Sequence, residues 1–357
     1  MDIFPMICSA AAKGASDLHL AAHSSPVFRI DGLLEPAADM PPLTPEDINQ
    51  AFKQLTAEKD RADFERFLEL DFGYTLPDVG RLRCNVAKQR GTISLTIRLI
   101  SLNIPTLDEL GLPDVCKELA LKPRGLMVVS GPTGSGKSTT LAAMINYLNG
   151  MGSRRVVTIE DPIEYIYSNN KCTITQRELG SDTRSFAQAL KHVVRQDPDV
   201  ILVGEMRDLD TAAAVLAIAE TGHLILTTGH APSASQAIER IIDLFPPHER
   251  NLVQMRLASL LLGVLCQALI PKAYETGRIP AVEIMLASPA IRNLIREGKI
   301  HQLPNTIRTQ VHLGMEIFDQ ALVNLYQNRL ISNESLFAFC NDEYEVSKLI
   351  NRVEVVQ

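Results

Sequence analysis

One eight-residue segment, Gly131–Ser138 (GPTGSGKS), constrains the fold of this 357-residue chain more than any other feature. It matches G-x-x-x-x-G-K-[ST] and lies between an apolar strand-like run, Leu126–Ser130, and an apolar helix-length segment, Thr139–Leu148. In that context the glycines let successive backbone N–H groups point inward at an anion, and the helix N-terminus adds its positive dipole end. The segment therefore predicts a loop that binds nucleotide phosphates; the alternative is a glycine-rich turn that opens an ordinary helix.

Two side chains of this loop are expected to act on the nucleotide directly. Lys137 would contact the β- and γ-phosphates of ATP, and the hydroxyl of Ser138 would ligate Mg²⁺. The residues predicted to bind the nucleotide through the loop are Gly131, Pro132, Thr133, Gly134, Ser135, Gly136, Lys137, Ser138 and Thr139.

An acidic residue, Glu205, closely follows a run that predicts a buried strand, Val200–Val203. At the carboxyl edge of a sheet, beside the phosphate loop, a carboxylate can polarise the attacking water. The alternative is a surface acid at a strand end. Asp208, three residues further on, is predicted instead to cap a helix over Leu209–Glu220.

A second acidic segment, Glu160–Glu164, follows the strand predicted at Val156–Ile159, and Pro162 turns the chain there. Glu160 and Glu164 are thus expected on the nucleotide side of the sheet. Carboxylates this close together are unfavourable unless a cation or positive partners share the site, so the segment indicates a role around Mg²⁺. The alternative is a solvated acidic turn.

Two histidines, His223 and His230, flank the strand predicted at Leu224–Thr228. Either histidine could sense the γ-phosphate, and the alternative is a hydrogen-bonded structural role. A strand rises about 3.3 Å per residue, so the two rings would lie roughly 23 Å apart, which argues against a metal ion bound by both.

Arginines are the other requirement of phosphoryl transfer. The candidates, each with a solvated surface position as its alternative, are Arg81, Arg83, Arg98, Arg124, Arg195 and Arg207.

The remaining pattern predicts an α/β protein of two domains. From residue 126 apolar runs alternate with helix-length segments, which is typical of a parallel sheet flanked by helices, and the last hundred residues are expected to be mainly helical, with Leu257–Ile270 a buried core segment. We divide the chain into an α+β domain over 1–100, a proline-containing linker with one short helix over 101–125, and a nucleotide-binding α/β domain over 126–357. The strands predicted in the first domain are 18–20, 27–30, 72–76, 81–88 and 92–100; one helix starts after Thr44 and a second contains Phe64, Phe67 and Leu68.

The composition excludes several classes of protein. A formal net charge of −7 argues against a nucleic-acid surface over the whole chain, and the absence of Trp disfavours base-stacking platforms. The six cysteines form no CxxC pair, so they predict reduced, mostly buried thiols rather than a zinc site. Asp2 stands where a secretory leader needs positive charge, which favours an intracellular protein.

Taken together, these motifs resemble the PilT-like retraction ATPases of type IV pili, within the secretion-ATPase (GspE/PilT) superfamily. The resemblance covers nearly the whole chain, and the tetracysteine zinc element typical of assembly ATPases is missing. The segments that carry it are 15–20 and 28–32 (PAS-like N-domain), 131–138 (Walker A), 158–164 (Asp box), 201–208 (Walker B), 221–230 (His box) and 290–297 (AIRNLIRE, the C-terminal motif of retraction ATPases). In that last segment Ile291, Leu294 and Ile295 form an apolar stripe, and Arg292, Asn293 and Arg296 are expected to face away from it as a coupling or partner surface.

The resemblance implies a PAS-like domain followed by a RecA-like P-loop ATPase domain with a helical C-terminal part, and ATP with Mg²⁺ as cofactors. It implies a homohexamer with each nucleotide held between the two domains. The implied roles are Glu205 as catalytic carboxylate, Glu164 as organiser of water and Mg²⁺, His230 in catalysis, Glu160 and His223 in nucleotide binding, Arg98 and Arg124 on the phosphates, and Arg81 and Arg83 as arginine sensors acting within a subunit or between subunits.

The resemblance further implies a motor for pilus retraction in the cytoplasm, at the cytoplasmic face of the inner membrane. Its partners would be the inner-membrane pilus platform protein, through which alone it would meet the membrane, and a paralogous retraction ATPase; nucleic acid is not expected. One departure is Gly229, because the His box usually reads Thr-Leu-His and here reads Thr-Gly-His. The alternatives are a pilus-assembly or type II secretion ATPase, a weakly hydrolysing accessory ATPase, and a nucleic-acid motor.

Overall fold

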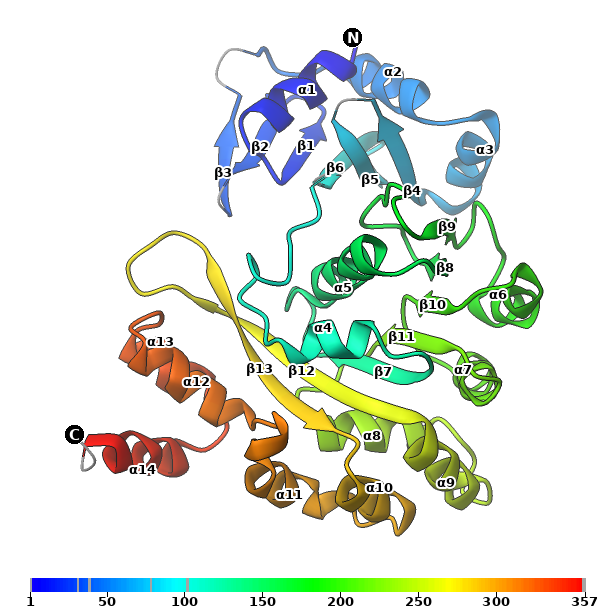
Figure 1. Cartoon of the computed structure of the whole chain (residues 1–357). Helices are drawn as coiled ribbons and strands as arrows, with labels where there is room; N and C mark the ends of the chain where they lie inside the picture. Colours follow the sequence, from blue (N-terminus) through cyan, green and yellow to red (C-terminus); the bar gives the residue numbers. More distant parts are fainter. Residues whose placement is uncertain (1, 31, 38–39, 78, 101–102, 355–357) are drawn as a thin grey trace. The chain divides into compact units, whose positions relative to one another are not determined.

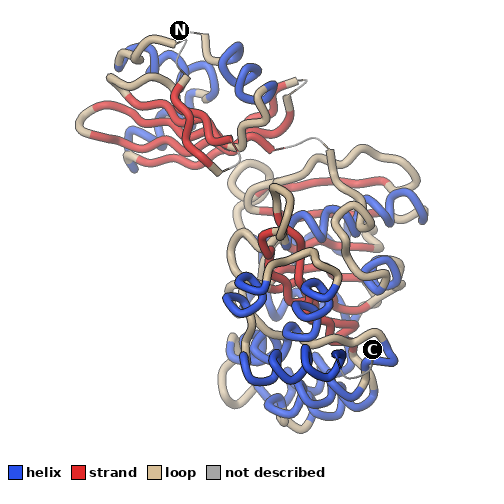
Figure 2. Tube along the Cα trace, turned by 90° about the vertical axis from the view of Figure 1, so that its left-hand side faces the viewer, coloured by secondary structure: helices blue, strands red, loops and turns tan. Residues whose placement is uncertain are grey.

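The computed structural model describes residues 2–30, 32–37, 40–77, 79–100 and 103–354, and it separates into two compact units (Figure 1). The first unit comprises Met1–Asn103 with Pro162–Ile166, and the second comprises Ile104–Asp161 with Tyr167–Gln357. Each unit has its own sheet and its own helices (Figure 2). None of the helices in the described ranges is both long enough and apolar enough to cross a membrane.

The first unit is an antiparallel sheet with helices on one face. The strand order is β3-β2-β1-β6-β5-β4. The strands are β1 (Asp17–Ala21), β2 (Val27–Ile30), β3 (Leu33–Pro36), β4 (Glu69–Leu76), β5 (Gly80–Gln89) and β6 (Thr92–Ile100), and the helices are α1 (Phe4–Ala12), α2 (Pro45–Leu55) and α3 (Glu58–Phe67). All five predicted strands are present and Thr44 caps α2, accepting a hydrogen bond from Asp47 N at 3.2 Å, whereas α1 and β3 were not predicted.

Alternation along β5 gives this sheet one apolar and one polar face. Leu82, Cys84 and Val86 are fully buried and join α1 and α2 in the core, so desolvation raises the pKa of the Cys84 thiol to about 12. Arg81 and Arg83, at the intervening positions, lie on the other face. The alternation of apolar and polar residues that predicted this strand therefore also places Arg81 and Arg83 on the same face of the sheet.

The second unit is a seven-stranded sheet of order β13-β12-β7-β11-β10-β8-β9. Every neighbouring pair in it is parallel except β12 with β13. The strands are β7 (Gly125–Ser130), β8 (Arg155–Glu160), β9 (Thr173–Glu178), β10 (Val200–Val203), β11 (Leu224–Thr228), β12 (Leu261–Pro271) and β13 (Arg278–Leu286). The helices are α4 (Val115–Ala120), α5 (Lys137–Met151), α6 (Phe186–Val193), α7 (Leu209–Glu220), α8 (Ala234–Asp243), α9 (Arg250–Leu260), α10 (Pro289–Arg296), α11 (Leu303–Thr309), α12 (Phe318–Gln327), α13 (Asn333–Phe339) and α14 (Glu343–Glu354).

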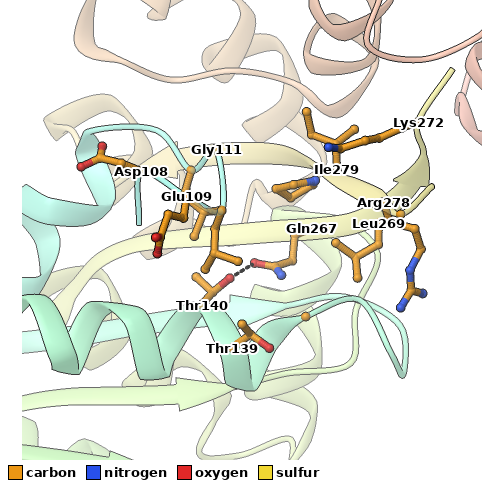
Figure 3. Close-up of a pocket in the computed structure, with 15 residues that line it drawn as sticks. Asp108, Glu109, Gly111, Thr139, Thr140, Gln267, Leu269, Lys272, Arg278 and Ile279 are labelled. Carbon is orange, nitrogen blue, oxygen red and sulfur yellow. Dashed lines mark hydrogen bonds between the residues drawn. The ribbon is translucent and has the colours of Figure 1, made fainter. Parts of the chain in front are cut away.

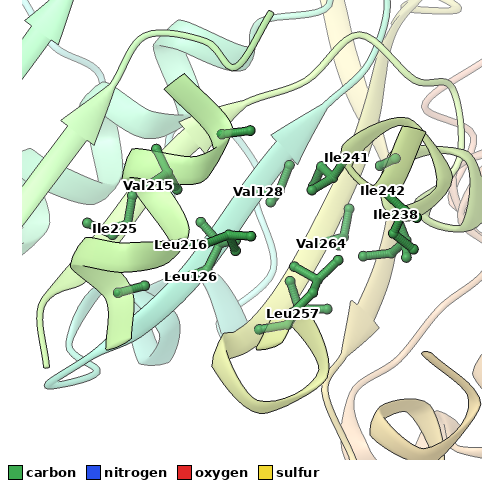
Figure 4. Packing of buried hydrophobic residues seen from close by; sticks show 14 of the residues in the cluster. Leu126, Val128, Val215, Leu216, Ile225, Ile238, Ile241, Ile242, Leu257 and Val264 are labelled. Carbon is green, nitrogen blue, oxygen red and sulfur yellow. The ribbon is translucent and has the colours of Figure 1, made fainter. Parts of the chain in front are cut away.

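Both faces of this sheet are covered, which explains why its central strands β7 and β10 are apolar almost throughout. Leu126 and Val128 of β7 pack with α7, α8 and α9 (Figure 4), while Met127 and Val129 pack on the opposite face with α4 and α5. A strand buried on both faces lacks the polar alternation of a half-buried one. The parallel, helix-flanked sheet predicted from the apolar runs is confirmed.

The expectation of a mainly helical last hundred residues is wrong for its first part. The apolar run at 257–270 ends α9 and then forms β12, which pairs with β7, and β13 follows as an antiparallel neighbour. A continuous apolar run does not by itself distinguish a buried strand from a buried helix, and here pairing with β7 decides. β9 was also not predicted. The segment after Ile104 packs its Leu107, Leu112 and Cys116 into the core beside α4 and α5.

The AIRNLIRE segment forms α10, and its first arginine points inward. Ile291 and Ile295 are fully buried, as predicted. Arg292 does not face away from the apolar stripe as predicted: it donates hydrogen bonds to four backbone carbonyl groups, at residues 258, 259, 261 and 287, between 2.5 and 2.8 Å. The planar guanidinium thereby satisfies the carbonyls at the end of α9 and fastens α10 to it.

We therefore predict that Arg292→Lys destabilises the protein, because the ammonium of lysine lacks the planar, forked set of N–H donors with which arginine reaches four carbonyl groups. The expected loss is about 2 kcal/mol, a fall in melting temperature of about 4–8 °C in thermal denaturation. Arg296→Lys, on the exposed side of the same helix, is the matched control and should leave the melting temperature within about 2 °C. Equal melting temperatures for the two variants would contradict the prediction.

Candidate nucleotide-binding site

The loop between β7 and α5 has the backbone that an anion site requires. Gly134 and Gly136 have φ of +77° and +87°, a region that side chains rarely adopt. At Gly131 an added Cβ would lie 2.3 Å from the carbonyl oxygen of Gln267, so the backbone there passes too close to β12 for any side chain. The glycines of the motif are therefore required by this conformation, which turns successive N–H groups inward at the start of α5.

The side chains of the loop complete a cradle for phosphate. Lys137 is only 8% exposed, and its ammonium donates to the carbonyl oxygens of Gly131 and Pro132 at 2.9 Å each. The buried hydroxyl of Ser135 has no hydrogen-bond partner within the described ranges. A folded protein rarely buries an unsatisfied hydroxyl, so Ser135, the inward N–H groups and the Lys137 ammonium fit a nucleotide's phosphate oxygens.

The described residues fit Mg²⁺ only in company with a nucleotide. Ser138 lies in the first turn of α5, where its hydroxyl can supply one oxygen ligand. Within the described ranges no group of three or more His, Cys, Asp or Glu side chains could hold a metal ion alone. Mg²⁺ commonly keeps several waters and takes its other ligands from substrate phosphates, which matches one hydroxyl beside a phosphate cradle.

A glutamine of β12 supports this loop and was not predicted. Gln267 is 3% exposed; its amide donates to the carbonyl oxygen of Ser135 at 2.7 Å, and its Oε1 accepts from the hydroxyl of Thr140 at 2.9 Å. It thus joins the loop to the first turns of α5. The only signal in the sequence is one amide within an otherwise apolar run.

A pocket of about 500 Å³ opens beside the same turn of α5 (Figure 3). Gly136, Thr139 and Thr140 form one side of it, next to the hydrogen bond between Thr140 and Gln267. Its other lining residues are apolar or charged: Leu110, Leu112, Leu269, Ile279 and Pro280, and Asp108, Glu109, Lys272 and Arg278. Apolar walls with a few polar groups suit a nucleoside base and ribose.

Glu205 lies at the carboxyl edge of the same sheet, after β10, and β11 separates that strand from β7. Its side chain is only 12% exposed, and each carboxylate oxygen has a cationic or polar partner. Oε1 forms an ion pair with Arg207, and Oε2 lies 3.2 Å from Nε2 of His230. The structure therefore brings Glu205 and His230 together and adds Arg207 from the list of candidate arginines.

The acidic segment Glu160–Glu164 divides between the two units. Glu160 ends β8 at the same carboxyl edge, is buried, and accepts hydrogen bonds from Thr158 at 2.6 Å and Gln176 at 3.3 Å. Glu164 belongs to the segment grouped with the first unit, so it is not among the residues that the second unit assembles. Asp208, as predicted, caps α7 by accepting from Thr211 N at 2.8 Å.

His223 and Arg124 lie at the opposite edge of the sheet from the phosphate loop. The carbonyl of His223 accepts from Gly125 N, at the first residue of β7, whereas the loop follows the last. The Nδ1 of His223 lies 2.9 Å from the Thr221 hydroxyl and 3.1 Å from the Ile218 carbonyl, a local structural arrangement. Within the second unit, then, neither residue is brought to the phosphates.

Of the four remaining candidate arginines, Arg81, Arg83 and Arg98 share the polar face of the sheet in the first unit. Arg83 and Arg98 are directly opposite each other on β5 and β6. Arg98 pairs with the buried carboxylate of Asp17 at 2.8 Å, and Arg81 donates to the Thr75 hydroxyl at 3.1 Å. Arg195, the last candidate, is an exposed residue after α6.

The cysteines behave as their spacing predicted. All six are free, and four of them are buried. Desolvation raises the pKa of the Cys116 thiol to about 12, so this thiol is a core side chain rather than a nucleophile.

A parallel sheet whose carboxyl edge carries a glycine-rich phosphate loop and a glutamate–histidine pair defines a P-loop ATPase. More narrowly, the chain belongs to the Type II/IV secretion system protein family, which matches residues 2–329. It is 45% identical to the Type IV pilus retractation ATPase PilT of Pseudomonas aeruginosa over 94% of this chain and 97% of that protein, and 41% identical to the Type IV pilus ATPase PilU of the same organism over 95% and 88%. A crystal structure of the pilus retraction motor PilT with bound ADP has a TM-score of 0.91 at 42% identity and covers 98% of this chain and 99% of that one.

The contacts of Gln267 predict a role in nucleotide affinity. Gln267→Leu keeps the volume of the side chain but removes both hydrogen bonds, so neither the loop nor the first turn of α5 is bonded to this side chain of β12 any longer. The Kd for ADP should rise about tenfold in a fluorescent-nucleotide titration. Thr140→Val, which leaves the bond from Gln267 to Ser135 intact, is the control and should raise the Kd less. Unchanged affinity in Gln267→Leu would show that the loop holds its shape without this residue.

Proposed function

We propose that this chain is an ATPase that powers the retraction of type IV pili. The observation that carries the proposal is the pairing of Glu205 with His230 at the sheet edge that also bears the phosphate loop. The extensive similarity to a retractation ATPase and to a pilus retraction motor with bound ADP gives that chemistry its context. A twitching motility protein of Neisseria gonorrhoeae, 40% identical over 88% of this chain, points the same way.

In the proposed mechanism the phosphate loop binds ATP through its N–H groups, Lys137 and the Ser135 hydroxyl, and the pocket beside Thr139 and Thr140 takes the nucleoside. Mg²⁺, bound through Ser138 and the phosphates, supplies charge neutralisation. Glu205 orients the attacking water and accepts its proton.

Two neighbours give Glu205 its orientation in this mechanism. Arg207 and His230 fix its two oxygens, so the carboxylate is already aligned before water arrives. His230 lies two residues after β11, the strand between β10 and β7. It therefore connects the acid to the strand that pairs with β7, and β7 leads into the phosphate loop.

The finer architecture belongs to the same proposal. The first unit is a PAS-like domain, approximately 1–100, and the second is a RecA-like domain with a helical C-terminal part. The working assembly is a homohexamer at the cytoplasmic face of the inner membrane, engaged with the pilus platform protein and with a paralogous ATPase. Arg81, Arg83 and Arg98 from the polar sheet face, with Arg124, Glu160, Glu164 and His223, complete nucleotide sites formed between domains or subunits.

A specific observation keeps an accessory retraction ATPase as a second candidate. At Gly229, where the resemblance expects Leu, a pocket of about 380 Å³ lies open, lined among others by Val128, Ile241 and Leu244. An added Cβ at Gly229 would lie 3.1 Å from the Ser130 hydroxyl. The loop that carries His230 therefore lacks the apolar packing that a leucine side chain would supply. The absence of this packing would slow ATP hydrolysis.

The proposed role of Glu205 predicts the behaviour of Glu205→Gln. The amide cannot accept the proton of water, so kcat for ATP should fall about 10²–10⁴-fold, as measured by phosphate release from the purified protein. ADP affinity should stay within about threefold, because the phosphate loop is untouched. Full ATPase activity in this variant would contradict the catalytic assignment.

Genetics separates the two directions of pilus movement. Deleting the gene should leave cells with surplus pili and no twitching, because extended pili would no longer be withdrawn. Bald cells would instead indicate an assembly ATPase. Normal retraction, together with negligible turnover by the purified protein, would favour the accessory candidate.

A further inference from the structure

Three buried side chains form a row across the sheet beneath the loop that carries His230. Ser130 of β7 is paired in register with Cys266 of β12, which is paired with Glu283 of β13. Side chains opposite one another in register project to the same face of a sheet. Glu283 is 7% exposed, and no metal-binding cluster within the described ranges includes it. A buried carboxylate is unfavourable, so its retention in a sheet core calls for a reason.

The two ends of this row hold the chain immediately after His230. The hydroxyl of Ser130 accepts from Ala231 N at 2.8 Å and donates to the Ala231 carbonyl at 2.7 Å. Glu283 Oε1 accepts from Ala234 N, the first residue of α8, at 2.6 Å. The segment 231–234 is thus fastened at both ends.

Helix α8 in turn holds His230 itself. Arg240, in the second turn of the helix, donates to the His230 carbonyl at 3.1 Å. The start of α8 is set by Glu283, and the position of Arg240 follows from that start because the helix is rigid. The backbone of His230, and with it the contact of its ring with Glu205, therefore depends on where Glu283 holds α8.

The same carboxylate also reaches the C-terminal helices. Glu283 accepts a backbone hydrogen bond from Phe318, the first residue of α12. Burial is the main cause that raises the pKa of Glu283, and these two backbone donors oppose it. One side chain therefore joins the starts of two helices, one that positions His230 and one that begins the C-terminal layer.

We propose that Glu283 is a positioning residue for ATP hydrolysis, which holds α8 so that His230 meets Glu205 and ties that loop to α12. This inference rests on the proposed ATPase function. Glu283 touches no reacting atom, and its effect passes through the backbone of 230–234.

The test compares Glu283→Gln with Asp319→Asn in the full-length protein. Asp319 is a control of the same chemistry because it is also a buried carboxylate that accepts two backbone N–H groups, those of Asn341 and Asp342. Its charge helps to raise the pKa of Glu283, but these hydrogen bonds of its side chain hold the chain after α13 and not α8 or the His230 loop. In Glu283→Gln one accepting oxygen becomes an amide donor that faces an N–H group. We expect kcat to fall about tenfold with KM within twofold, whereas Asp319→Asn should change kcat less than twofold at a similar loss of melting temperature.

Hydrogen–deuterium exchange reports the position of the loop without relying on activity. Glu283→Gln should raise amide exchange in peptides covering 231–236 and 317–321, and Asp319→Asn should raise it only around 341–344. A variant that spares the carboxylate is Ala234→Pro. This substitution removes the N–H donor at the first position of α8, where proline is tolerated. The preceding residue, Ser233, already has the extended backbone that proline requires before it. The variant should lower kcat in the same way as Glu283→Gln.

The outcomes separate the inference from the function on which it rests. If the wild-type protein hydrolyses no ATP, the proposed function fails first. If wild type is active and Glu283→Gln keeps wild-type kcat and wild-type exchange in 231–236, the inference is wrong. Equal kcat losses in Glu283→Gln and Asp319→Asn would likewise overturn it, because they would reflect general stability alone.

Discussion

The parallel pairing of β7 with β11 on one side and β12 on the other is the constraint on which the rest of the second unit depends. Because β7 is buried on both faces, it can tolerate no polar side chain until it ends at Ser130. The phosphate loop begins at that point, and the neighbouring parallel strands end at the same edge. Glu160, Glu205 and His230 therefore reach the site from separate parts of the sequence.

Polar contacts rather than apolar packing hold the site once the sheet has formed. Gln267 fastens the phosphate loop to α5, Arg207 and His230 orient Glu205, and Ser130 fixes the segment after His230. The contacts of Gln267 and Ser130 lie where water is excluded, so they are stronger than they would be on the surface, whereas Arg207 and His230 reach Glu205 from the solvent side. The same arrangement makes the site sensitive to charge, because a bound phosphate alters the electrostatics of all of them together.

Local patterns in the sequence were sufficient for the phosphate loop, for the part of the sheet from β8 to β7 that carries Glu205 and His230, and for the Asp208 cap. They were insufficient for Gln267 and Glu283, because both lie on strands that an apolar run did not distinguish from helix. The prediction for Arg292 was wrong for a related reason. Helical periodicity assigns a polar residue to the outward face, whereas the carbonyl groups that Arg292 bonds lie at the end of α9 and, in one case, just before α10. Contacts between distant segments decide such positions.

Gly229 shows how these constraints meet in one loop. A side chain there would press on the Ser130 hydroxyl, the group that bonds both backbone polar atoms of Ala231. Glycine leaves those bonds undisturbed, but it gives up the apolar contact that would anchor the loop by packing. The position of His230 is consequently set by hydrogen bonds from Ser130, Arg240 and Glu283. Hydrogen bonds depend steeply on distance and angle, so the position of His230 is sensitive to small displacements of β7, β13 and α8.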